Sequence, residues 1–227
     1  PRAVRSLRYS RHKMVPHRFH RTPKSWGYQL QLADAAHLKN VPYDLLVLDM
    51  DDFVRNNEGV AISALKFRPD GERREVVSYV SIGEAEDYRW YWHIIREDYP
   101  PSWLLSENPE WKGNYAVAFW DARWQALIFQ SVNRAIDFGF DGIYLDKCDV
   151  MHDLIARGHN IGRSVDEMKR AMISFICKIA STARRRVPGF RIIMQNAEDL
   201  LDVPQGSQDL LSVLSGVAKE DLLLGAE

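Results

Sequence analysis

Short apolar runs alternate with segments of helical periodicity along most of this chain. The runs that predict strands are residues 26–32, 43–50, 75–82, 115–120, 142–145, 191–195 and 213–219. Continuous apolar runs are typical of parallel strands that are covered on both faces. Strands that alternate with helices predict an α/β fold, here a (β/α)8 TIM-type barrel. Seven candidate strands leave that barrel without its last strand and helix in this chain.

Two of the intervening helices have clear start signals. Asp121 is predicted to cap a helix over residues 122–138, where apolar residues recur every three to four positions. Ser164 and Glu167 have the spacing of a capping box, which predicts the start of a second helix that Pro188 ends. Both helices would lie between strands, as a barrel of this type requires.

Two further segments carry local predictions. Residues 84–95 look helical, directly after the third candidate strand. Asp141 and Gly142, at the entry to the fifth strand, predict a tight turn with a positive φ at Gly142. The competing architecture is an open doubly wound sheet, but no G-x-G-x-x-G motif follows any candidate strand, so a dinucleotide-binding fold loses its main support.

Carboxylates follow five of the candidate strands. They are Asp49, Glu84, Asp146, Glu198 and Glu220. Because the carboxyl ends of barrel strands meet at one face, these acids are expected to share a rim. Two carboxyl groups suffice to hydrolyse a glycosidic bond, one protonating the leaving oxygen and the other attacking the sugar or activating a water. Asp146 is the strongest candidate, because it ends a buried-looking run and Lys147 is predicted to hold it ionised.

Composition fits one domain with an uneven charge. The chain has 227 residues, is 46% hydrophobic and has a net charge of −1. Residues 1–24 hold eight Lys/Arg and no acid, and are interpreted as a basic extension. Residues 25–227, the predicted barrel domain, hold 22 Lys/Arg against 31 Asp/Glu. An acidic body favours a cationic or neutral ligand and argues against nucleic acid as a partner.

Other features of the sequence exclude little. No apolar run is long enough to span a membrane, and two Cys with seven scattered His give no zinc spacing, so neither a metal nor a cofactor is expected. The chain opens at Pro1 without an apolar signal core, so for a secreted protein the targeting segment is expected to have been removed or left out. A monomer is expected.

Five blocks of the sequence carry a family resemblance. They are residues 83–92 (GEAEDYRWYW), 108–120 (beginning NPEW), 139–146 (GFDGIYLD), 195–199 (QNAED) and 216–221 (GVAKED). In this order they resemble glycoside hydrolase family 114, the endo-α-1,4-polygalactosaminidase family, in its bacterial and archaeal branch. The match runs from about residue 26 to the end of the chain. It implies a secreted or cell-surface TIM-type barrel that cuts galactosamine-containing polysaccharide.

The resemblance also assigns the catalytic pair. It implies that Asp146 is the catalytic aspartate and that Glu220 is its partner. The expected outcome is a retaining, endo-acting cleavage of a cationic or partly acetylated amino-sugar polymer. The residues predicted to contact that polymer are Tyr28, Asp49, Glu84, Trp120, Asp149 and Asn196.

Two other functions stay open at this point. The same aromatic and acidic residues would serve a non-catalytic polysaccharide-binding barrel. A metal-dependent hydrolase is the third reading, in which Asp49, Asp51 and Asp52 would hold a hard cation.

Overall fold

The protein is a curled, open parallel sheet covered by helices, seen in a computed structural model that describes residues 22–97, 100–204 and 206–220. The sheet has six strands in the order β1–β2–β3–β7–β8–β9, and every neighbouring pair is parallel. Their bounds are β1 Trp26–Gln29, β2 Leu45–Leu48, β3 Glu75–Ser81, β7 Gly142–Asp146, β8 Arg191–Gln195 and β9 Gly216–Ala218. The α/β prediction is confirmed, in the form of an incomplete barrel. The predicted basic extension falls almost wholly outside the described residues.

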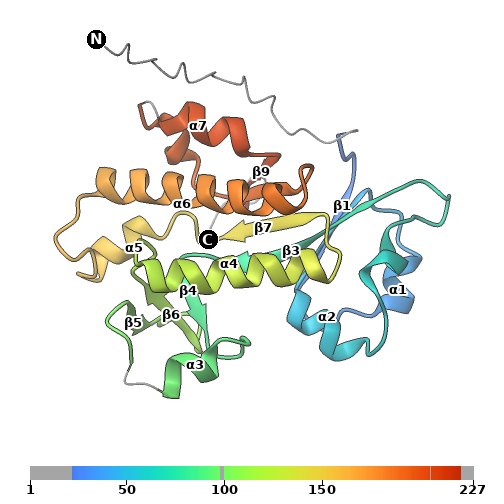
Figure 1. The fold of residues 1–227 in the computed structure, drawn as a ribbon, viewed down its shortest axis with the longest axis horizontal. Helices are drawn as coiled ribbons and strands as arrows, with labels where there is room; N and C mark the ends of the chain where they lie inside the picture. Colours follow the sequence, from blue (N-terminus) through green and yellow to red (C-terminus); the bar gives the residue numbers. More distant parts are fainter. Residues whose placement is uncertain (1–21, 98–99, 205, 221–227) are drawn as a thin grey trace, which may run out of the picture.

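Helices connect the strands and cover one face of the sheet. They are α1 Ala35–Lys39, α2 Met50–Asn56, α3 Trp92–Glu97, α4 Ala122–Asp137, α5 Met151–Ala156, α6 Val165–Arg186 and α7 Gly206–Val213, with short 3₁₀ helices at η1 Ile62–Leu65 and η2 Glu198–Asp202. The two longest, α4 and α6, lie side by side across β7 (Figure 1). None of the described helices is long and apolar enough to cross a membrane.

Both predicted helix starts are confirmed. The Asp121 side chain accepts a hydrogen bond from the amide of Arg123 at the start of α4. Ser164 and Glu167 form the reciprocal capping box at the start of α6. These bonds satisfy amide groups that the first helical turn leaves without partners.

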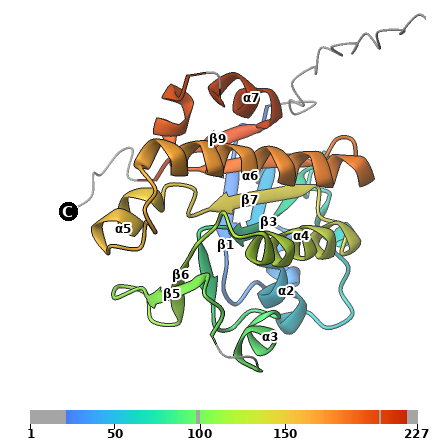
Figure 2. The same ribbon diagram turned by 60° about the vertical axis from the view of Figure 1, so that its left-hand side comes forward.

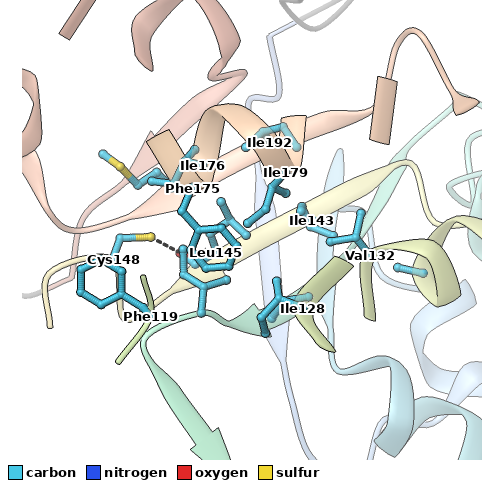
Figure 3. Close-up of a cluster of buried hydrophobic side chains, with 14 of the residues drawn as sticks. Phe119, Ile128, Val132, Ile143, Leu145, Cys148, Phe175, Ile176, Ile179 and Ile192 are labelled. Atoms are coloured by element: carbon cyan, nitrogen blue, oxygen red, sulfur yellow. Dashed lines mark hydrogen bonds between the residues drawn. The ribbon is translucent and has the colours of Figure 1, made fainter. Parts of the chain in front are cut away.

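The main core lies between the sheet and its helices. Side chains from β7, β8, α4 and α6 interdigitate there (Figure 3). They include Ile128, Val132, Ile143, Leu145, Phe175, Ile176, Ile179 and Ile192. A second, smaller cluster covers the opposite face of the sheet, with Leu45, Val47, Val77, Tyr144 and Ile193. Because side chains alternate along a strand, the residues of this inner cluster show which strand positions face the barrel interior.

A separate antiparallel sheet corrects two sequence predictions. Its strands are β4 Glu84–Glu86, β6 Asn114–Val117 and β5 Leu104–Glu107, in the order β4–β6–β5. It lies with α3 below α4 in both ribbon views (Figure 2). The run at 115–120 is therefore not a barrel strand, since β3 pairs directly with β7. The described barrel sheet thus has six strands instead of seven, and the predicted helix over 84–95 is a strand and a turn followed by α3.

Gly142 is required for a different reason than the sequence suggested. Its φ is not among the positive ones, so the predicted turn conformation is wrong. Instead, a Cβ at Gly142 would lie 2.4 Å from the Cβ of Arg191 and 2.6 Å from its carbonyl oxygen. Strand β8 therefore passes too close for any side chain at this position.

We expect Gly142→Ala to lower the free energy of unfolding by about 1–3 kcal/mol, because the new methyl group forces β7 and β8 apart. Gly189→Ala is the matched control, since a Cβ at that glycine would meet no atom within 4 Å and its φ is not positive. The control should change stability by less than about 0.5 kcal/mol. Urea denaturation of both variants measures the difference, and equal effects would contradict the close approach.

Candidate active site

Several polar side chains lie on the inner face of the sheet, at the carboxyl ends of its strands. Tyr144 and Ile193 belong to the inner cluster, and two positions further along their strands come Asp146 and Gln195. On β3, Tyr79 packs against the same cluster. The parallel register pairs Tyr79 with Tyr144. Strand alternation therefore brings Asp146 and Tyr79 to one rim.

Asp146 is held at both carboxylate oxygens. The Tyr79 hydroxyl donates to Oδ2 at 2.5 Å, and the backbone amide of Lys147 donates to Oδ1 at 2.7 Å. The ammonium of Lys147 does not face Asp146 as the sequence suggested. It lies 3.7 Å from Oε1 of the buried Glu84. The side chain of Asp146 is thus fixed by a phenol and an amide while it stays partly open to solvent.

Glu220, which follows β9, is held by Asn196, which follows the neighbouring strand β8. The amide nitrogen of Asn196 donates to Oε2 of Glu220 at 3.1 Å, and the backbone amide of Glu220 donates back to Oδ1 of Asn196 at 3.1 Å. The backbone amide of Asn196 also donates to the carbonyl of Ala218 at 2.8 Å. Asn196, predicted to contact substrate, therefore orients the second candidate acid in this structure.

Left-handed backbone conformations follow the ends of β7 and β8. Lys147 has φ 58°, Asn196 has φ 53° and Ala197 has φ 57°, although none is a glycine. Such a conformation costs about 1–2 kcal/mol for residues such as Lys and Ala, and less for Asn. Strain of this kind persists where the surrounding structure fixes it, and it concentrates at functional sites.

Tyr28 on β1 and Tyr144 on β7 form an aromatic pair on the inner face of the sheet. The rings of Tyr28 and Tyr144 are in edge contact, with centroids 5.5 Å apart. Burial raises the pKa of each phenol, and the charges of both Asp146 and Glu220 raise it further. The charges of both carboxylates thus act on one aromatic pair.

A buried ionic cluster lies beside Tyr79, and the sequence reasoning missed most of it. Arg89 forms ion pairs with Asp49 and, at 2.6 Å, with Glu86. The Tyr88 hydroxyl donates to Glu86 at 2.5 Å. Burial raises the pKa of the Glu86 carboxyl, and Arg89 opposes that shift. The sequence did hold a pattern that points to Glu86. Glu84 and Glu86 alternate with Ala85, as residues of a strand do, whereas the helical prediction for residues 84–95 hides this alternation.

Three of the residues predicted to contact substrate interact with other side chains or amides of this protein. Asp49 caps α2 through a bond to the amide of Asp52, in addition to its ion pair with Arg89. Glu84 is buried and accepts from Asn108 at 2.8 Å, while its other oxygen has no partner among the described residues. Trp120 is half-buried, with the guanidinium of Arg163 4.9 Å from its ring. Substrate contact by these three stays a prediction.

Asp149 and Tyr28, the other two residues predicted to contact substrate, are more exposed to solvent than Asp49 and Glu84. Asp149 is half-buried, and burial together with the charges of Asp146 and Asp153 raises the pKa of its carboxyl, against the opposing charge of Lys147. Tyr28 is 42% exposed, which leaves part of its ring available for a ligand.

The acids proposed as metal ligands have other partners in this structure. Asp51 pairs with Arg134 at 2.9 Å, and Asp52 accepts from the amide of Ala33 at 3.1 Å. In the part of the chain that the structure describes, no group of three or more His, Cys, Asp or Glu is arranged to hold a metal ion.

The fold defines the class of protein to which this chain is similar. It superposes on Ega3 of Aspergillus fumigatus in complex with galactosamine with a TM-score of 0.62 at 18% identity, covering 87% of this chain and 66% of that one. The glycoside hydrolase domain of PelA from Pseudomonas aeruginosa gives a TM-score of 0.58 at 18% identity, covering 87% of this chain and 67% of that one. At these identities the likeness shows the fold alone, which in this chain is an α/β half-barrel.

The sequence then gives the family. The model of glycoside hydrolase family GH114 matches residues 10–224, and the chain belongs to this family. An uncharacterized protein of Methanocaldococcus jannaschii is 39% identical over 199 residues, and one of Thermotoga maritima is 37% identical over 198 residues. Each match covers 87% of this chain, which spans only 56% and 59% of the length of those relatives. The resemblance seen in the five sequence blocks is confirmed.

Proposed function

We propose that this chain is an endo-acting glycosidase that cleaves α-1,4-linked galactosamine and N-acetylgalactosamine polysaccharide with retention, using Asp146 and Glu220. One observation carries the proposal. Asp146 ends β7 and Glu220 follows β9, at the carboxyl ends of strands of one parallel sheet, and each side chain is held by its own set of hydrogen bonds. Membership of GH114 supports glycosidase chemistry, and the fold it shares with the galactosamine complex of Ega3 supports the choice of sugar.

The chemistry follows from the roles that these two carboxyl groups can take. In the first step, an oxygen of Asp146 attacks the anomeric carbon while Glu220 donates its proton to the glycosidic oxygen, and the bond between that carbon and oxygen breaks. In the second step, Glu220 removes a proton from water, which attacks the same carbon and releases Asp146. The two steps together consume one water for each glycosidic bond that is cut.

The charges around the two candidate acids support a cationic substrate. Asp49 and Glu86 are paired with Arg89, whereas the hydrogen bonds that hold Asp146 and Glu220 come from a phenol and from amides, which are neutral. Free ammonium groups of a partly deacetylated polymer would pair with such carboxylates. Asp149, a half-buried acid shortly after Asp146 in the chain, is the proposed partner for one of them. A secreted or cell-surface location suits a polymeric substrate and stays a prediction.

We expect the wild-type chain to release reducing ends from a partly deacetylated α-1,4-galactosamine polymer at the same rate with and without EDTA, because no step of the proposed reaction uses a metal. A colorimetric reducing-end assay measures this directly. A chain that binds the polymer in a pull-down assay without releasing reducing ends would instead be the non-catalytic binding barrel. Activity that EDTA removes and a divalent cation restores would favour the metal-dependent reading.

A further inference from the structure

Among the described residues, Tyr79 is the one side chain that donates a hydrogen bond to Asp146. Its hydroxyl donates to Oδ2 at 2.5 Å, and the other oxygen of Asp146 is bound by the amide of Lys147. Burial raises the pKa of the Tyr79 phenol well above its ordinary value, and the charges of Glu86 and Asp146 raise it further. In this bond the phenol is the donor, because an ionised carboxylate can only accept.

The ring of Tyr79 is itself held in place. The guanidinium of Arg89 lies 5.7 Å from the ring centroid of Tyr79, in the range of a cation–π contact. Arg89 has little freedom, because its side chain is 9% exposed and is paired with both Glu86 and Asp49. Glu86 lies on β4, so the small antiparallel sheet contributes to this contact.

We infer that Tyr79 is a positioning residue for the proposed reaction, holding Asp146 in the orientation from which it attacks, and that Arg89 keeps Tyr79 in place. The inference rests on the proposed function for its kinetic meaning. It assigns a role to β4 of the small antiparallel sheet and to the turn after it, which hold Glu86 and Arg89 beside Tyr79. Orienting a nucleophile lowers the barrier without changing how tightly the substrate binds.

The test compares two phenols that lie near the same guanidinium. Tyr88 lies 5.0 Å from Arg89 and donates to a carboxylate at 2.5 Å, as Tyr79 does, but its acceptor is Glu86 instead of Asp146. Tyr79→Phe should lower kcat on the polymer by about 10- to 100-fold, the loss expected for one hydrogen bond to a charged group. KM and the polymer Kd should stay close to wild type. Tyr88→Phe should lose much less of kcat, because the bond it removes goes to Glu86 and not to the proposed nucleophile.

Three results would overturn the inference. They are a Tyr79→Phe variant with wild-type kcat, a loss that appears in KM alone, and an equal loss in Tyr88→Phe. A double-mutant cycle on thermal stability with Tyr79→Phe and Asp146→Ala tests the hydrogen bond without any assay of activity. Non-additive losses in Tm are expected, and additive losses would contradict the bond. A wild-type chain that cuts no polymer would refute the proposed function, while the cycle would still decide whether Tyr79 holds Asp146.

Discussion

Asp146→Asn is expected to lower hydrolysis of the polymer by about 10⁴-fold or more, the loss typical of removing a nucleophile. The amide keeps the shape of the carboxylate, and its oxygen can still accept from the Tyr79 hydroxyl. It cannot form the covalent bond to the sugar. Because the group acts only as the transition state forms, the loss should fall on kcat while the polymer Kd stays close to wild type.

The matched control for Asp146→Asn is Asp153→Asn. Asp153 is an exposed acid on α5, shortly after β7, and its replacement removes the same charge from the same side of the barrel. It should retain nearly full activity. Reducing-end assays give kcat, titration calorimetry gives the Kd, and thermal melting confirms that both variants are folded. Near wild-type turnover by a folded Asp146→Asn variant would remove Asp146 from the mechanism.

Glu220→Gln should lower activity on the polymer by about 10²- to 10⁴-fold, the usual contribution of a general acid. The replacement can still accept the hydrogen bond from Asn196, so the side chain should keep its place. The loss should be much smaller on an aryl galactosaminide with a good leaving group, because that leaving group departs with little help from a proton. The contrast between the two substrates separates acid catalysis from general damage to the site.

A neighbouring acid provides the control for Glu220→Gln. Glu198 is exposed and pairs with Lys219 at 2.9 Å, in the same pair of loops as Glu220 and Asn196. Glu198→Gln should leave both activities close to wild type. If Glu220→Gln loses the same factor on the polymer and on the aryl substrate, Glu220 is not the acid, and the two roles would have to be exchanged or the pair abandoned.

The elements that could be predicted from the sequence are those whose own residues carry a clear pattern. The five correctly placed barrel strands before β9 are short apolar runs, and α4 and α6 begin at capping residues that make the expected bonds. Residues 84–86 could not be assigned in this way. Glu-Ala-Glu favours a helix by propensity, but its pairing with residues 114–116 makes it a strand. Partners distant in sequence decide such cases, and they override local preference.

The residues of the candidate site also divide into those that a local pattern indicates and those that depend on partners distant in the sequence. Asp146 and Glu220 could be proposed because each follows an apolar run, and a family resemblance supported both. Tyr79 gave no such signal, since it is one of several apolar-looking residues inside β3. Its importance depends on the register of β3 against β7, which sets its hydroxyl beside Asp146. Arg89 lies in the turn after β4 and is held beside Tyr79 by ion pairs with Asp49 and Glu86, which come from two different segments.

The most direct test is to identify the residue that bonds to the sugar. A fluorinated galactosaminyl fluoride slows the second step of a retaining glycosidase, so the covalent intermediate accumulates and can be found by peptide mass spectrometry. We expect one sugar for each protein chain, attached to Asp146, and no label in the Asp146→Asn variant. An active enzyme that is labelled at another residue, or that turns over the reagent without any covalent label, would contradict the proposed mechanism.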